Sequence, residues 1–319
     1  MRKRRVLMTD GLAYYHLMSR TVNGEKWFGP REKERMRKII RQVAGFSGVR
    51  VVTYAVMENH FHVLVEVPPK KAPVSDEEIV RRYRILYPES TPWQPVSPEA
   101  LEKLLREDGV EGKRLRQALL RRMHDVPWFA KTVKQRFASW FNRGRERFGP
   151  VFAERFKSVL IEADLKTLRT IAAYIDLNPV RAGKANDPKD YRFCGYAEAV
   201  AGGREARAGL AVLDRDLSGY RMTLFGSGAA AREGKQSIER KEAVRVLESE
   251  KGKLSLAEAL RCRIRYFTDG VALGSPDFIE GIAAPINRER TYPARPNRLR
   301  GNVWGGLSAL NGIRKDLFG

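Results

Sequence analysis

Apolar and polar residues alternate near the start of the chain in a pattern typical of a strand followed by a helix. From Leu12 to Arg20 every second side chain falls on one face, which predicts a strand. Pro30 opens a helix that reaches Phe46, because proline favours a first helical turn and the apolar residues after it recur at helical spacing. These apolar positions are Met36, Ile39, Ile40 and Val43.

Two further strands follow and form a hairpin. β-branched residues predict a strand from Val49 to Met57, and a second strand runs from His60 to Val67. Glu58 and Asn59 lie between them as turn residues. The chain up to Val67 therefore runs strand, helix, strand, strand.

The character of the sequence changes from Pro68 to about residue 128. Prolines recur there and separate polar helical pieces such as Pro98–Glu107 and Lys113–Met123. We interpret residues 68–128 as an insertion with helical segments.

Regular structure resumes with a helix from about Phe129 to Arg147 and a strand, Val151–Ile161. Asp164 can cap the next helix, which ends near Asn178 because Pro179 disfavours α geometry in the residue before it. The predicted apolar stripe of that helix is Leu165, Leu168, Ala172 and Ile175.

Residues beyond about 200 are richer in glycine and arginine and less periodic. Helices are predicted at Ser237–Lys251, Ser255–Arg263 and Pro276–Ile282. A turn at 268–270 gives Ser255–Ile282 a faint resemblance to a helix-turn-helix, which would bind duplex DNA. We predict a domain at 1–200 that contains the insertion, and a mostly helical accessory region at 201–319.

The formal charge of the 319 residues is +22, from 60 lysines and arginines against 38 acidic residues. Such an excess favours a polyanionic partner, and the planar guanidinium of arginine suits phosphate. An anionic membrane is the rival partner, but no compact basic amphipathic helix with aromatic anchors is present. Composition therefore favours nucleic acid.

Neither targeting nor disulfide chemistry is indicated. The basic start, Met1–Arg5, is followed by Thr9 and Asp10 before an apolar segment develops, and no apolar run is long enough to span a membrane. The two cysteines, Cys194 and Cys262, have neither a pairing pattern nor nearby histidines. We expect a cytoplasmic, prokaryotic, nucleoid-associated protein that is a monomer or a homodimer.

Two histidines stand two residues apart in the predicted strand His60–Val67. A period of two sends the imidazoles of His60 and His62 to one face, where both can bind one divalent ion. Taken alone, a pair of strand histidines is more often structural than metal-binding.

A tyrosine and an asparagine share one face of the helix that begins after Asp164. Tyr174 and Asn178 are four residues apart, away from the apolar stripe. Alone, Tyr174 also fits an amphipathic tyrosine at the edge of a helix.

The two motifs together resemble a known family. Tyr54–Val67 is similar to the two-histidine strand of the HUH endonucleases, and Tyr-Ile-Asp-Leu-Asn-Pro-Val-Arg-Ala-Gly, from Tyr174 to Gly183, resembles the tyrosine helix of the REP-associated tyrosine transposases. The resemblance extends to Tyr15-His16, Arg155–Ser158 and Asp190–Arg192.

The resemblance implies an α+β fold with a ferredoxin-like βαββαβ core and an antiparallel sheet. It also implies that His60, His62 and Asn178 ligate Mg²⁺ or Mn²⁺ while Tyr174 attacks a phosphate of single-stranded DNA at hairpin-forming repeats. The products would be a 5′-phosphotyrosine and a free 3′-OH, and reversal with a second strand would transfer that strand without ATP.

Two other functions remain open. The chain could be a catalytically silent, domesticated protein that binds DNA hairpins. It could also be a replication or mobilisation initiator of the HUH superfamily, although no phosphate-binding glycine-rich loop of a helicase is present.

Several residues are candidates for DNA contact, each beside a plainer interpretation. His16 shares a strand face with Arg20 and either stacks on DNA or satisfies a polar group in the core. Arg155 and Lys157 share a strand face that either binds phosphate or is simply solvated, and Arg181 is either a phosphate clamp or an ordinary surface arginine. The aromatic residues Phe137, Trp140 and Phe141 favour a core over base stacking.

Glu58 departs from the family, whose members usually have proline there. Its carboxylate could add a metal ligand, accept a proton or merely cap the turn.

Overall fold

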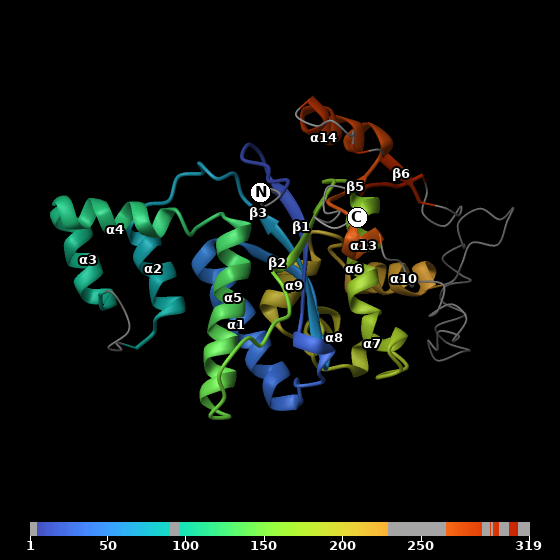
Figure 1. Cartoon of the computed structure of the whole chain (residues 1–319), viewed down its shortest axis with the longest axis horizontal. Helices are drawn as coiled ribbons and strands as arrows, with labels where there is room; N and C mark the ends of the chain where they lie inside the picture. The colour runs from blue at the N-terminus through green and yellow to red at the C-terminus, as the bar shows by residue number, and fades with distance from the viewer. Residues whose placement is uncertain are drawn as a thin grey trace, which may run out of the picture.

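One mixed sheet runs through the centre of the computed structural model (Figure 1), which describes residues 5–89, 96–228, 266–288, 294, 296–299 and 306–311. Its seven strands follow the order β2-β3-β1-β4-β5-β7-β6. Only β4 and β5 pair in parallel among these neighbours. The strands are β1 Ala13–Arg20, β2 Arg50–Val56, β3 His60–Val67, β4 Lys157–Ile161, β5 Ala272–Gly274, β6 Pro296–Arg298 and β7 Ser308–Leu310.

The first four strands have the ferredoxin-like arrangement. Helix α1 (Pro30–Ser47) lies between β1 and β2, and α5 (Val126–Arg143) lies between β3 and β4. The antiparallel order β2-β3-β1-β4 is that of a βαββαβ unit. The predicted α+β class and antiparallel core are therefore confirmed, and the β1, α1 and β3 boundaries agree with the sequence pattern within one residue.

Each face of the sheet is covered by its own set of helices. Helices α1 and α5 pack on the face that presents Phe61, Val63 and Val65 of β3, and Phe137 and Phe141 lie in that core as expected. Helix α6 (Leu165–Asp176) lies on the opposite face, where Leu64 is buried. Figure 1 shows α1 and α5 on one side of the strands and α6 on the other. Further short helices on the α6 face are α8 Gly195–Val200, α9 Arg204–Leu210 and α10 Leu217–Gly228.

The insertion forms a helical arm at the left of Figure 1. It holds α2 (Asp76–Leu86), α3 (Pro98–Glu107) and α4 (Val110–Leu120), and α2 packs against α1. The bounds of α3 were predicted, whereas α4 begins three residues earlier than predicted and α2 was not predicted. Ser75 caps α2 by accepting a hydrogen bond from the Glu78 N–H, a signal that the sequence carried.

The described part of the C-terminal region adds strands that the sequence did not predict. Between α13 (Tyr266–Asp269) and α14 (Pro276–Arg288), the chain forms β5 and joins the edge of β4. A strand, not a simple turn, thus separates these two helices. The predicted turn at 268–270 is wrong, because Thr268 and Asp269 belong to α13. The predicted helices Ser237–Lys251 and Ser255–Arg263 lie outside the described residues and stay predictions.

The chain between α5 and β4 is less regular than predicted. A strand was expected over Val151–Ile161, but β4 begins only at Lys157. Residues 151–153 instead run beside the end of β1, where Phe152 forms an isolated bridge with Thr21 and the Ala153 N–H donates to the Arg20 carbonyl at 3.0 Å. This detour forms one wall of the candidate site.

Among the helices that the structure describes, none is both long and apolar enough to span a bilayer.

Candidate active site

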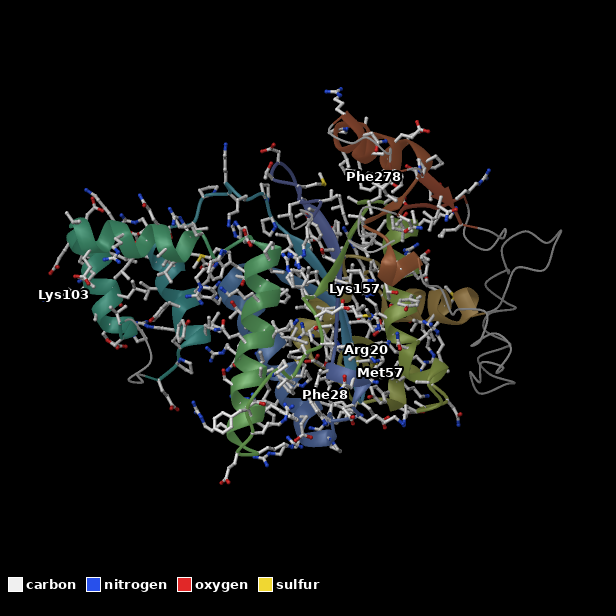
Figure 2. The ribbon with its side chains drawn as sticks, viewed as in Figure 1. Arg20, Phe28, Met57, Lys103, Lys157 and Phe278 are labelled. Carbon is white, nitrogen blue, oxygen red and sulfur yellow. The ribbon has the colours of Figure 1, made fainter. Side chains whose placement is uncertain are left out.

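A cavity of about 660 Å³ opens between the end of β1, the start of β3 and the end of α6. It brings together eight of the nine residues that the sequence singled out, all except His16. In Figure 2, Arg20 and Lys157 lie near the middle of the molecule, far from Lys103 on the helical arm. The predicted residues that line the cavity are Arg20, His60, His62, Arg155, Lys157, Tyr174, Asn178 and Arg181.

Strand register explains why these side chains meet. Antiparallel pairing sets Arg20 opposite His60 and Met18 opposite His62, and Met18 also faces Lys157 across the other edge of β1. Because side chains alternate along a strand, all five of these residues point to the face that α6 covers. The two histidines, Arg20 and Lys157 therefore form one surface of the cavity, which we call its floor.

The orientation of His62 is fixed by a chain of hydrogen bonds. His16 Nδ1 lies 2.8 Å from the Phe267 carbonyl, and because a carbonyl only accepts, this nitrogen carries the proton. In the neutral His16 ring, Nε2 is then the acceptor, and it lies 2.9 Å from His62 Nδ1. His62 Nδ1 thus donates, which leaves the lone pair of Nε2 for another partner.

His60 has the same arrangement with a different acceptor. Asn59 Nδ2 donates to the Gly24 carbonyl at 2.8 Å, so its Oδ1 is the atom that faces His60 Nδ1 at 2.7 Å. His60 Nδ1 therefore donates to Asn59, so Nε2 is the ring nitrogen that carries the lone pair.

Both histidines are held neutral. Burial, reinforced by the charge of Arg20, lowers the pKa of His60 to about 4. Burial also lowers the pKa of His62 well below its ordinary value, with the His16 and His60 rings as the next causes. Neutral imidazole is the form that binds a metal ion.

These features fit the chemistry of a divalent metal site. Metal-binding histidines usually donate their second ring nitrogen to a fixed acceptor, as His60 and His62 do. Within the described part of the chain, no three histidine, cysteine or carboxylate side chains gather into a complete ligand set. A third protein ligand could be the amide of Asn178, which lines the same cavity.

Asn178 reaches the cavity because the chain stays helical past the end of α6. Leu177 has αR geometry at φ −82° and ψ −4°, and a short second helix, α7, spans Asn178–Arg181. Pro179 sits in the first turn of α7, where a missing N–H costs little. The predicted helix end near Asn178 is correct, and Pro179 redirects the helix instead of unwinding it.

Helix α6 is anchored at both ends. Its N-terminus is capped by Asp164, whose carboxylate accepts from the Thr167 N–H at 2.9 Å, as predicted. Near its C-terminus, the buried Asp176 accepts hydrogen bonds from Thr53 and Tyr220. The predicted apolar stripe needs one correction, because Leu165 is 51% exposed and Ile171 takes its place in the core. Leu165 is the first residue of α6.

Tyr174 stands over the two-histidine floor. Its ring centroid lies 5.7 Å from that of His62 and 5.0 Å from that of Phe267, both edge-on. The Arg181 guanidinium lies 4.4 Å from the Tyr174 centroid, and its buried Nε and Nη1 have no hydrogen-bond partner among the described residues. A tyrosine hydroxyl, two imidazole lone pairs and unsatisfied arginine N–H groups thus face one cavity.

His16 takes a different place from the other candidates. It is 1% exposed and lies beneath the cavity, not in its lining. Of the two roles that the sequence left open, this burial favours the core polar group over direct stacking on DNA, because its ring nitrogens are taken by Phe267 and His62.

Glu58 lies outside the cavity lining and is paired with lysine. Its carboxylate contacts Lys184 Nζ at 2.6 Å, and this hydrogen bond lowers the pKa of Glu58. The pair ties the β2–β3 turn to the segment that follows α7. Of the roles considered, a structural one at the turn agrees best with this contact.

Sequence reasoning missed several residues of the site. Asn59 carried a signal, since it directly precedes His60, but it was taken only as a turn residue. Glu154, the one carboxylate in the cavity lining, lay in a predicted strand and directly precedes the motif Arg155–Ser158, but it was not singled out. Phe267 and Thr268 lie far along the chain, and no local pattern links them to the histidines.

Comparison with known proteins gives a family match and structural likenesses. A solved structure of a REP-associated tyrosine transposase bound to a REP hairpin is 15% identical, with a TM-score of 0.37, and the alignment covers 64% of this chain and 87% of that one. No curated protein sequence matches the chain. The family model described as "Transposase IS200 like" matches residues 10–84, which include both histidines but end before Tyr174. Over that segment, the chain is similar to the IS200-like transposases.

Proposed function

We propose that the chain is a metal-dependent nuclease and strand transferase for single-stranded or hairpin DNA. The observation that supports this most is the Tyr174 ring, 5.7 Å from the His62 ring, above a floor to which His60 and His62 present their Nε2 atoms. The match of residues 10–84 to the IS200-like transposase model supports the same class of reaction.

The metal ligands in this proposal are His60 Nε2, His62 Nε2 and the Asn178 amide oxygen. Bound Mg²⁺ or Mn²⁺ would supply a Lewis acid that polarises the scissile phosphate. Asn59 and His16 act on the ligands, because they fix the ring tautomers through hydrogen bonds of 2.7 and 2.9 Å.

Tyr174 is the proposed nucleophile. Its Oη forms a bond to phosphorus as the bond from phosphorus to the 3′ oxygen breaks, which gives a 5′-phosphotyrosine and a 3′-OH. The phenol loses one proton and the leaving 3′ oxygen gains one. Since one phosphodiester replaces another, attack by a 3′-OH on the phosphotyrosine reverses the step and joins strands.

The basic side chains of the cavity hold the DNA in place. Arg181 offers the Nε and Nη1 protons that no described residue accepts, next to the Tyr174 ring. Arg20, Arg155 and Lys157 line the same cavity, against the single carboxylate of Glu154. Arginine and lysine that converge on one point favour a phosphate there.

The test is incubation of the protein with a DNA hairpin oligonucleotide and Mn²⁺, followed by denaturing electrophoresis. A covalent protein–DNA adduct is expected with the wild type. It should be absent with Tyr174→Phe, His60→Ala or EDTA, while much of the salt-dependent binding remains. An adduct with Tyr174→Phe would refute the assignment of the nucleophile. Tight hairpin binding without cleavage under any divalent ion would favour the catalytically silent binding protein.

A further inference from the structure

The loop between α5 and β4 holds one aromatic side chain away from the rest of the protein. Phe148 is 94% exposed, whereas the nearby aromatic residues Trp27, Trp140 and Phe141 are packed at the core. In Figure 1, α5 runs to the lower edge of the molecule, where the chain turns back toward β4.

The loop has a defined shape. Asn142 Nδ2 donates to the Gly149 carbonyl at 2.9 Å, and the Arg147 N–H donates to the Asn142 carbonyl at 3.0 Å. Two residues have left-handed backbone geometry, Glu146 at φ 49° and Gly149 at φ 93°. Phe148 therefore projects from a turn whose backbone is held by hydrogen bonds to Asn142.

Three arginines, Arg143, Arg145 and Arg147, precede Phe148 in the chain. Arg145 stacks on Phe141 at 4.1 Å and pairs with Glu32 at 3.2 Å, and Arg147 stacks on Trp27 at 4.2 Å. Arg143, the last residue of α5, is exposed next to this loop, and Glu146 is the only carboxylate between residues 143 and 149. Stacking on Phe141 and Trp27 orients the guanidinium groups of Arg145 and Arg147, which precede Phe148 in the same loop. An uncovered aromatic ring among arginines is the combination with which proteins bind unpaired nucleotides.

The loop is continuous with the wall of the active-site cavity. Five residues after Phe148, Ala153 lines that cavity. Such a segment spans at most about 18 Å. The intervening chain is held against the end of β1 by the hydrogen bond from the Val22 N–H to the Val151 carbonyl at 3.0 Å. A strand a few nucleotides long reaches from the cavity to Phe148.

We infer that the loop 143–149 is a subsite for the unpaired part of the DNA, where Phe148 stacks on a base and the arginines hold the neighbouring phosphates. This inference rests on the proposed function for its substrate class. It adds a binding residue that contributes to affinity for single strands without taking part in the chemistry.

The experiment measures binding of a fluorescent 12-nucleotide oligothymidylate by anisotropy, in EDTA and with Tyr174→Phe protein, so that cleavage plays no part. Phe148→Ala and Phe148→Leu should each weaken binding about five- to hundredfold, the range for loss of one stacked base. Phe148→Trp should bind like the parent protein. Val110, 89% exposed on the helical arm, provides the matched control, and Val110→Ala should change nothing.

Three results would overturn the subsite. One is unchanged binding with Phe148→Ala. Another is binding by Phe148→Leu equal to that of the parent, which would mean that aromatic stacking is not involved. The third is an equal loss of affinity for a 12-base-pair duplex, which offers no unpaired base. The proposed function fails on a different readout, the Tyr174-dependent adduct, so the two failures are distinguishable.

Discussion

His16 Nε2 lies 2.9 Å from His62 Nδ1, and the far side of His16 is hydrogen-bonded to the carbonyl of Phe267, 251 residues away along the chain. The C-terminal region thus determines, through one buried imidazole, which nitrogen of His62 carries its proton. His16 is therefore a positioning residue in the proposed metal site. Its effect is transmitted to the ion only through His62.

Replacing His16 should weaken metal binding without removing a ligand. His16→Phe keeps a ring but offers no acceptor, so we expect the affinity for Mn²⁺ to fall about ten- to hundredfold. Titration of Mn²⁺ followed by electron paramagnetic resonance measures this affinity directly. Binding of oligothymidylate in EDTA should stay the same.

Tyr14→Phe is the matched control for this change. Tyr14 lies on the same face of β1 and donates a buried hydrogen bond of 2.7 Å to Glu66, but it does not line the cavity. Equal losses of Mn²⁺ affinity in both variants would mean that His16 acts only through general stability.

Arg155 should contribute to DNA binding through charge. If it contacts one phosphate, Arg155→Ala should reduce the slope of log Kd against log salt by about 0.7 for single-stranded DNA. Lys103 is exposed on the helical arm, far from the cavity in Figure 2, and serves as the comparison. A slope that changes equally with Lys103→Ala would show that the charge effect is not local to the cavity.

Local patterns were sufficient for the core of the fold. The alternation that predicted β1 and β3 arises because the face against α1 and α5 is mainly apolar, whereas the opposite face, also buried, carries polar residues such as His16 and His62. The cap at Asp164 follows from its short carboxylate side chain. Residues four apart lie on the same face of a helix, and Tyr174 and Asn178 accordingly line the same cavity.

Features that depend on distant partners could not be predicted. Strand β5 is only three residues long and is stabilised by pairing with β4 and β7, so its own residues carry little periodicity. The burial of His16 likewise depends on Phe267, which lies in another part of the chain. Residues 151–156 have the composition of a strand. They do not extend β4, because Phe152 pairs with Thr21 and the Ala153 N–H donates to the Arg20 carbonyl at the end of β1.

Asp176 should be important for stability although it lies outside the cavity lining. Its carboxylate is fully buried and accepts from the Thr53 hydroxyl at 2.8 Å, the Tyr220 hydroxyl at 2.7 Å and the Tyr196 N–H at 3.1 Å. In Asp176→Asn, the amide NH₂ would face these donors. We expect a loss of about 2–4 kcal/mol in the free energy of unfolding at pH 5, measured with urea, because buried groups left without a partner cost roughly 1–3 kcal/mol each.

Tyr220→Phe provides a milder comparison for Asp176→Asn. It removes one donor and leaves the carboxylate with its other partners, so the expected loss is about 1 kcal/mol. If the two variants are equally stable, the Asp176 carboxylate does not stabilise the fold through its combined hydrogen bonds with Thr53, Tyr196 and Tyr220.

The contribution of Asp176 should also depend on pH. Burial raises the pKa of Asp176 to about 6 in the folded protein, despite hydrogen bonds from Tyr220 and Thr53 that lower it. Because this pKa lies above the unfolded value of about 3.9, the stabilising contribution is fully present below about pH 4 and is lost as the pH rises through about 6. The stability difference between wild type and Asp176→Asn should therefore narrow between pH 4 and 7, by up to about 3 kcal/mol. A difference that widens with rising pH would contradict the raised pKa.

Two glycines of helices should respond in opposite ways to alanine. A Cβ at Gly209 of α9 would lie 2.2 Å from the Val51 carbonyl oxygen and 2.7 Å from that of Val52, both in the backbone of β2. Since backbone cannot rotate away as a side chain can, Gly209→Ala should lower the free energy of unfolding by about 1–3 kcal/mol.

A Cβ at Gly281 of α14 would meet nothing within 4 Å, so Gly281→Ala should leave stability unchanged or raise it by up to about 1 kcal/mol through helix propensity. Urea unfolding of both variants checks the pair, and a tolerated Gly209→Ala would mean that α9 does not lie this close to β2.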